Sequence, residues 1–422
     1  MSIINVLWGL FGIMVVCGIA FLFSNNKKKI NYRLVLIGIG FQITFAWVVL
    51  ATRLGKRVLE AISDFVNTII GYANEGIDFV FGGLYTEESG ISFVVAFNVL
   101  PMIIFFASLI ALLYYLRIMP FVFKYIGGFF AKLLSTTKRE SVVAAANIFV
   151  GQTESPFVVK PYLSKMSNSE IFTVMTCGLA SIAGTMLAAY AALGIRLDYL
   201  LTASFMAAPS GLIMAKIFYP ETETINEDAD LKVSGDEESS NVIDALSRGA
   251  KNGLDVALIV GATLIAFVAA IAIVNGFLGY VGGWFGVELS LQTIFGYIFS
   301  PLAFAIGIPW ADAVYAGAFF GEKLVLTEFI AFTDFASKLE QLSAKSEMII
   351  TFALCGFANF TSMATLTNTL GRLVPERNAL FMQLSFRSVF AGMLASMLSA
   401  ACAGIGLENA GTSTQSCLTS CF

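Results

Sequence analysis

Three consecutive polar residues interrupt an almost wholly apolar stretch of the chain. Gln152, Thr153 and Glu154 follow a glycine and precede a Ser-Pro pair, in the string GQTESPF at Gly151–Phe157. A second acidic residue, Glu328, lies in the apolar string AFFGEKLVLTEFIAF. An ionisable residue in such lipid-soluble sequence is costly and is usually placed there for a function. The two carboxylates are therefore the first candidates for chemistry.

Each acidic segment precedes a stretch with a shared pattern. The string CGLAS at Cys177–Ser181 recurs as CGFAN at Cys355–Asn359, within longer similar stretches. We count an odd number of spans between the two copies, which would invert the second relative to the first. Inverted repeats with interrupted helices are typical of secondary transporters, whose sites lie near the bilayer midplane. Chance similarity between two Ala/Gly-rich helices is the alternative interpretation.

Neither carboxylate has a basic residue close by in sequence. The nearest is Lys160 for Glu154 and Lys323 for Glu328. An unpaired carboxylate in an apolar environment must be protonated or balanced by a cation. The polar groups near both acids are amides and hydroxyls without a positive charge, so a neutral polar solute fits better than an anionic one.

Oxygen ligands for a cation flank the interruptions of the first repeat. Asn147 and Ser181 carry side-chain oxygens there, and backbone carbonyls freed by glycine and proline cannot face lipid. Such oxygens suit a hard monovalent cation such as sodium. Ser181 and Ser362 are also compatible with ordinary helix contacts, and Phe357 with packing.

The composition requires lipid around most of the chain. Of 422 residues, 57% are hydrophobic and 13% are charged, against about 25% charged in soluble domains. Two apolar segments, Leu291–Phe320 and Val142–Tyr162, contain interrupting Pro, Gly and acidic residues and are predicted to be broken or re-entrant. The sequence predicts an all-α polytopic membrane protein with about eight spanning helices: Ile4–Phe23, Leu34–Ala51, Phe93–Leu116, Phe172–Leu193, Tyr199–Phe218, Val256–Leu278, Met348–Leu370 and Leu380–Ile405.

Charge patterning gives an orientation. The string NNKKK after the first span favours a retained helix with a cytoplasmic C-terminal end. Arg53, Lys56 and Arg57 fall on the opposite side. The segment Glu221–Asp244 holds nine acidic residues and one lysine, which predicts a solvated linker.

Several functional classes are disfavoured. The chain has no histidine, and it lacks a Walker loop, GxSxG and HExxH, so an enzyme is not expected. An ion channel remains the alternative from another class, but channels use rings of charge or repeated carbonyl filters, whereas these polar residues are chemically diverse. Cys417 and Cys421 in the polar tail are the cysteines that could pair.

The strings GQTE, GLASIAG, TEF and CGFANFTSMA together resemble the concentrative nucleoside transporter family, in its bacterial sodium-coupled branch. The resemblance runs from the first span to the last. It implies eight transmembrane helices, two re-entrant hairpins, interfacial helices and a homotrimer in the bacterial inner membrane. It also implies elevator-like symport of uridine-like nucleosides with Na⁺, without an organic cofactor or nucleic acid. Proton coupling is the closest alternative.

The family pattern implies a role for each candidate residue. By resemblance the nucleobase contacts Gln152, Thr153 and Glu154, with Leu258 and Met186 lining its pocket. The ribose would contact Glu328, Asn359, Ser362 and Phe357. The sodium ion would use the side chains of Asn147 and Ser181 and the carbonyls of Val150 and Ile182.

The repeats and the resemblance together divide the chain into six parts. Residues 1–120 are expected to be scaffold helices with an interfacial helix, and residues 246–280 a further scaffold helix. The first repeat, 121–220, and the second, 281–375, would form the transport part. Residues 221–245 are the acidic linker, and 376–422 the last helix and polar tail.

Overall fold

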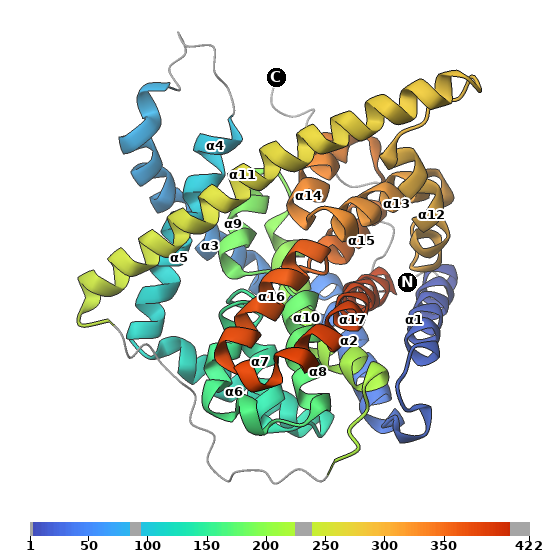
Figure 1. The fold of residues 1–422 in the computed structure, drawn as a ribbon. Coiled ribbons are helices and arrows are strands. Elements are labelled where there is room, and N and C mark those ends of the chain that lie inside the picture. Colours follow the sequence, from blue (N-terminus) through green and yellow to red (C-terminus); the bar gives the residue numbers. More distant parts are fainter. Residues whose placement is uncertain (1–2, 85–93, 224–238, 406–422) are drawn as a thin grey trace.

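The computed structural model describes residues 3–84, 94–223 and 239–405, and every regular element in those ranges is a helix (Figure 1). The N-terminal half contains α1 (Ile3–Leu22), α2 (Tyr32–Ala51), α3 (Arg53–Phe81), α4 (Val95–Asn98), α5 (Leu100–Tyr115), α6 (Ile118–Leu134), α7 (Lys138–Ala146), the 3₁₀ segment η4 (Ser155–Lys165), α8 (Asn168–Ala180), α9 (Gly184–Ala192) and α10 (Leu197–Phe218). The remainder contains α11 (Val242–Gly283), α12 (Leu291–Ala305), α13 (Trp310–Val325), α14 (Glu328–Ser337), α15 (Ala344–Leu354), α16 (Phe360–Leu373) and α17 (Asn378–Ile405). Cys417 and Cys421 lie outside the described residues.

The all-helical membrane fold is confirmed. Over the described residues, seven helices are long and apolar enough to span a bilayer, or eight if the bent pair α12–α13 counts as one span. The chain bends by 119° between these two helices, as expected for the interrupted stretch Leu291–Phe320. The other interrupted stretch, Val142–Tyr162, is also broken, between α7 and η4. The helix α3 is long but carries several charged residues and is not among these spans.

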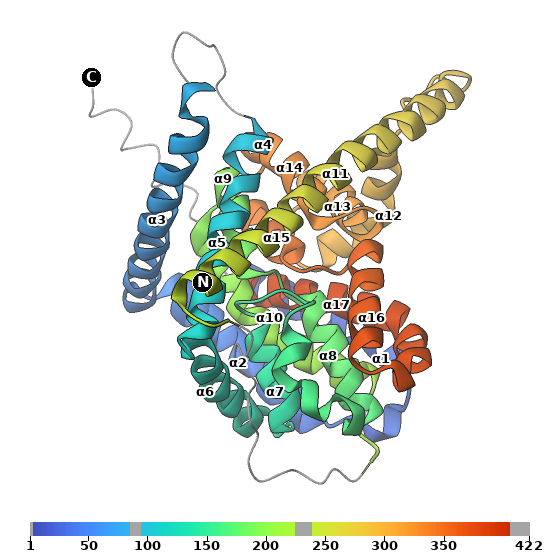
Figure 2. The ribbon, with the colours of Figure 1, turned by 60° about the vertical axis from the view of Figure 1, so that its left-hand side comes forward.

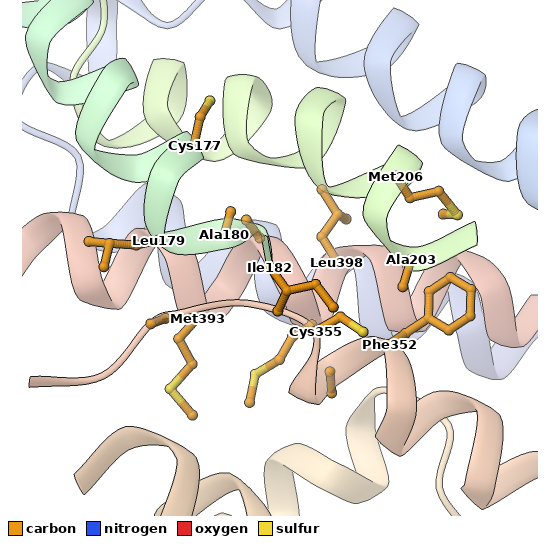
Figure 3. Packing of buried hydrophobic residues seen from close by; sticks show 14 of the residues in the cluster. Cys177, Leu179, Ala180, Ile182, Ala203, Met206, Phe352, Cys355, Met393 and Leu398 are labelled. Carbon is orange, nitrogen blue, oxygen red and sulfur yellow. The ribbon is translucent and has the colours of Figure 1, made fainter. Parts of the chain in front are cut away.

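Two predicted continuous spans are broken helices. The span Phe172–Leu193 divides into α8 and α9, and the span Met348–Leu370 divides into α15 and α16. The two breaks cross: the backbone N–H of Phe357 donates to the carbonyl of Ser181 over 3.1 Å. Figure 3 shows Ala180 and Ile182 of the first break beside Cys355 of the second. Each break therefore satisfies backbone groups of the other away from lipid.

A glycine makes this crossing possible. A Cβ atom on Gly356 would lie 2.8 Å from the carbonyl oxygen of Ala180 and 2.7 Å from Oγ of Ser396. Any side chain at this position would therefore push the two breaks apart.

The crossing breaks lie against a buried bundle. In α10 and in the span that contains α17, 94% of the residues are buried, whereas only 11% of the α11 span is buried. Figures 1 and 2 show α11 as one long oblique helix that projects from the body, and α3 at the periphery beside α5. A helix that is apolar on all sides and mostly exposed needs lipid or another subunit around it. The breaks are thus held by the bundle, with α11 running past them.

Candidate solute-binding site

The first polar stretch forms the tip of a hairpin. Its first arm, α7, begins with a capping box in which Thr137 and Glu140 satisfy each other's backbone N–H groups, and it ends at Asn147. The second arm, η4, starts at Ser155 and Pro156, where the missing proline N–H suits the first turn. The tip between these arms holds Gln152, which is buried, and Thr153 and Glu154, which are partly or well exposed.

The hairpin tip is packed onto the break between α8 and α9. The N–H of Gly184 donates to the carbonyl of Phe149 over 2.9 Å. A Cβ atom on Gly151 would lie 3.6 Å from Cβ of Ala183, and one on Gly178 would lie 3.2 Å from Cβ of Gln152. Val150 and Ile182, on either side of these contacts, are both buried. The segment that follows Asn147 and the segment that follows Ser181 are therefore neighbours.

Asn147 has a buried oxygen without a hydrogen-bond donor. Its amide nitrogen donates to the carbonyl of Val143 over 2.9 Å, so Oδ1 points elsewhere and has no partner among the described residues. Ser181 donates its hydroxyl proton to the carbonyl of Cys177 over 3.1 Å, which leaves the lone pairs of Oγ available. A buried acceptor without a donor is costly, and a cation at this point would satisfy it.

The second carboxylate lies at the start of α14 and is held by two donors. Nδ2 of Asn359 donates to Oε2 of Glu328 over 2.7 Å, and the hydroxyl of Tyr190 donates to Oε1 over 3.2 Å. Oδ1 of Asn359 also caps α16 by accepting from the N–H of Ser362 over 2.7 Å. Glu328 and Asn359 are both buried. The second hairpin, formed by α13 and α14, and the second break, between α15 and α16, are thus joined through one carboxylate.

A cavity of about 250 Å³ lies between these parts. It brings together seven of the candidate residues: Gln152, Thr153, Glu154, Met186, Glu328, Phe357 and Ser362. Asn359 does not line the cavity itself, but it donates a hydrogen bond to Glu328, which does. The remaining wall is mainly α11, through Val256, Ile259, Val260, Thr263 and Leu264.

Leu258 does not line this cavity. It lies on the same helix as Ile259 and Val260, but its side chain is 62% exposed. Successive residues on an α-helix are rotated by about 100°, so a shift of one position turns a side chain away from the cavity. Ile259 and Val260 line this part of the cavity instead.

The lining combines groups of different chemistry. Two carboxylates, one amide and several hydroxyls face the same space as Phe357 and Phe329, and the lining contains no lysine or arginine. Such a mixture of acceptors, donors and an aromatic face suits a neutral solute with a flat ring and several polar edges.

Tyr190 is the site residue that the sequence did not indicate. Its hydroxyl reaches Glu328, 138 positions away along the chain, and its ring stacks on Phe332 with centroids 4.3 Å apart. Tyr190 lies four residues after Met186, on the same face of α9, and this spacing is the signal by which it could have been found. The hydroxyls of Thr185, Thr263, Thr361 and Thr365 also line the cavity.

A second cavity, of about 750 Å³, adjoins the first. The two share Glu154 and Thr185, and the second continues between α5 and the first turns of α11, past Tyr114, Lys251 and Asp255. The site therefore connects to the end of the molecule where α11 begins.

Comparisons with known proteins identify the family of the chain. Residues 199–404 match the family model for the C-terminus of Na⁺-dependent nucleoside transporters, residues 11–84 match the N-terminus, and residues 96–196 match "Nucleoside recognition". The chain is 51% identical over 403 residues to the uncharacterized transporter YutK of Bacillus subtilis, covering 95% of this chain and 99% of the relative. It is 47% identical over 413 residues to the nucleoside permease NupC of Helicobacter pylori, covering 96% and 98%.

The fold matches solved structures over nearly the whole chain. The TM-score is 0.90 against CNTnw in an inward-facing substrate-bound state, at 46% identity, covering 95% of this chain and 99% of that one. It is 0.92 against a variant of CNTnw in an outward-facing state, at 46% identity and 96% and 99% coverage. The chain therefore belongs to the concentrative nucleoside transporters, and it is a bacterial-type membrane permease rather than an enzyme.

Proposed function

We propose that this transporter carries uridine-like nucleosides into the cell together with sodium ions. The observation that carries the proposal is the buried, donor-free oxygen of Asn147 at the end of α7, in the same hairpin whose tip lines the cavity together with Glu328. A cation and a neutral polar solute then bind within one packed unit. Binding of one stabilises the arrangement that the other needs, which is the thermodynamic basis of coupling.

The proposed nucleoside orientation follows from the chemistry of the two tips. Gln152, Thr153 and Glu154 offer donors and acceptors that match the edge of a nucleobase, with Met186 and Ile259 against its faces. Glu328 accepts hydrogen bonds, which suits the vicinal hydroxyls of a ribose. Asn359 holds Glu328 in place, and Ser362 and Phe357 complete the sugar side.

The proposed sodium site uses oxygens from the segments that follow α7 and α8, where the tip of the first hairpin packs onto the first break. Oδ1 of Asn147, Oγ of Ser181 and the carbonyls of Val150 and Ile182 all belong to the neighbouring ends of α7 and α8. These are helix C-termini, whose free carbonyls carry partial negative charge and favour a cation. The residues present therefore fit sodium.

The proposed mechanism is an elevator-type exchange within a homotrimer in the bacterial inner membrane. In this proposal the two repeats, residues 121–220 and 281–375, move as a transport part against scaffold helices from residues 1–120 and 246–280. The acidic linker 221–245 joins the two parts, and residues 376–422 follow the second repeat. The exposed apolar side chains of α11, among them Ile265, Ile273 and Phe277, would face lipid or the neighbouring subunits.

Uptake into proteoliposomes tests the proposal. An inward sodium gradient should drive accumulation of labelled uridine, and Asn147→Ala should raise the sodium concentration needed for half-maximal uptake. Ser204→Ala is a matched control, because Ser204 is buried on α10 away from the cavity. Uptake that follows a proton gradient without sodium would favour the proton-coupled alternative. Uptake that ignores both gradients would refute coupled symport.

A further inference from the structure

Lys323 is a buried cation without a carboxylate partner. Its side chain is 1% exposed, on the last turn of α13. The ammonium donates to the carbonyl of Ala353 over 2.7 Å and to Oγ of Ser396 over 3.3 Å. No carboxylate of the described residues lies within ion-pair distance of it. The other deeply buried lysine, Lys216, has such a partner in Glu140 at 2.6 Å.

The partners of Lys323 are the ends of helices. Ala353 lies in the last turn of α15, which stops at Cys355 because the chain unwinds there. Ser396 also donates to the carbonyl of Cys355 over 3.1 Å. The ammonium therefore lies where the C-terminal turns of α13 and α15 meet. The free carbonyls at the C-terminus of α15 carry partial negative charge, and a cation beside them is stabilising.

The first repeat has the same arrangement at the proposed sodium site. There the C-terminus of the first hairpin arm, α7, meets the C-terminus of the helix before the break, α8. In the second repeat, α13 is the first hairpin arm and α15 is the helix before the break. Asn147 and Lys323 both come from the end of the first arm, five or more residues before the acidic residue of the hairpin.

We propose that the ammonium of Lys323 is a tethered counterpart of the coupling ion, occupying in the second repeat the position that sodium takes in the first. This inference rests on the proposed sodium site. It assigns Lys323 a positioning role: its charge holds the break at Cys355–Asn359 and, through Asn359, the carboxylate of Glu328. The two carboxylates of the site are then matched by two cations, one mobile and one covalently attached.

Substitution of Lys323 tests the proposal on the purified full-length protein. Lys323→Ala removes the ammonium and leaves space for an ion, whereas Lys323→Met fills the same volume without charge. Binding of labelled uridine is measured against NaCl concentration, with and without methylammonium chloride. Lys338→Ala is the matched control, since Lys338 ends the same hairpin and pairs with Asp334 at 2.8 Å.

We expect uridine binding by the wild type and by Lys338→Ala to depend on the first power of sodium concentration. Lys323→Ala should bind about tenfold to a hundredfold more weakly at the same NaCl, because hydrogen bonds to a charged group are lost. Uridine binding by Lys323→Ala should recover when methylammonium is added, or when a second sodium ion takes the place of the ammonium, so that binding depends on the second power of sodium concentration. Lys323→Met should show neither recovery.

Three results would overturn the inference. The first is that Lys323→Ala binds uridine with wild-type affinity and with the first-power sodium dependence of the wild type. The second is a loss of uridine affinity that neither sodium nor methylammonium reverses, and the third is equal recovery of Lys323→Ala and Lys323→Met. If neither variant folds, a second-power sodium dependence in the wild type overturns it, and a first-power dependence supports it. Sodium-independent uridine binding by the wild type would instead refute the proposed function itself.

Discussion

Replacing Glu328 by glutamine should weaken binding of the ribose without disturbing the packing of the second hairpin. Asn359 Nδ2 and the Tyr190 hydroxyl occupy one position on each carboxylate oxygen. A carboxylate has about four acceptor positions, which leaves about two for a ribose. In Glu328→Gln the carbonyl oxygen can keep the bond from Asn359. The new NH₂ group can donate to Tyr190, whose hydroxyl also accepts, so the hairpin should remain folded.

The expected loss is then confined to the bound sugar. A hydrogen bond to a charged group contributes about 1.5–3 kcal/mol, which corresponds to about a tenfold to hundredfold change in affinity. We therefore expect Glu328→Gln to weaken uridine binding by that factor. The preference for uridine over 3′-deoxyuridine should shrink as well, because the side chain that accepts a hydrogen bond from the 3′-hydroxyl has lost its charge.

Equilibrium binding of labelled uridine, with 2′- and 3′-deoxyuridine as competitors, measures both effects. Glu322→Gln is the control: Glu322 is also buried and accepts from an amide, Nε2 of Gln292, over 2.9 Å, but it does not line the cavity. It should bind uridine as the wild type does. Wild-type affinity in Glu328→Gln, or an unchanged preference between uridine and the deoxynucleosides, would refute the assignment of the sugar to Glu328.

Two further predictions concern stability. Gly253→Ala should destabilise the protein by about 1–3 kcal/mol, because its Cβ would lie 2.7 Å from Cα of Ile104 on α5; Gly276→Ala, with no atom near, should be neutral or slightly stabilising. Equal melting temperatures for the two variants would contradict the close packing of α5 on α11. Glu140→Ala should lower stability by about 3 kcal/mol, because it removes the partner at 2.6 Å from the buried ammonium of Lys216 and leaves Glu221, at 3.9 Å, as a more distant one. Thermal unfolding in detergent measures this loss, and an unchanged melting temperature would show that the pair does not hold the base of the first hairpin.

Much of the fold could be predicted because lipid imposes simple rules on sequence. Long apolar stretches must be helices, and the Gly and Pro residues around Gln152 and after Leu291 marked real interruptions. The break at Cys355–Asn359 was missed because its cause is tertiary. Its backbone is satisfied by Ser181 of the other repeat, and a stretch read alone gives no sign of such a partner.

The site was predicted to a similar extent and for similar reasons. Polar residues in apolar segments stood out, and five of them line one cavity: Gln152, Thr153, Glu154, Glu328 and Ser362. Leu258 lies outside the cavity lining, because composition does not fix the rotation of a helix that is apolar on all sides. Tyr190 was missed because its hydroxyl meets Glu328 only through the fold. The helix α11 begins at Val242, four residues before the expected scaffold helix 246–280, so its first turn lies in the stretch that was predicted to be linker.

A structure of the protein determined with uridine and sodium chloride would locate both the nucleoside and the ion. We expect density for the nucleoside in the cavity between the hairpins, with the base at Gln152 and Glu154 and the ribose at Glu328. We also expect an ion bound by Asn147 and Ser181. A nucleoside bound only in the adjoining cavity beside Lys251, or one with its sugar against Gln152, would refute the proposed site.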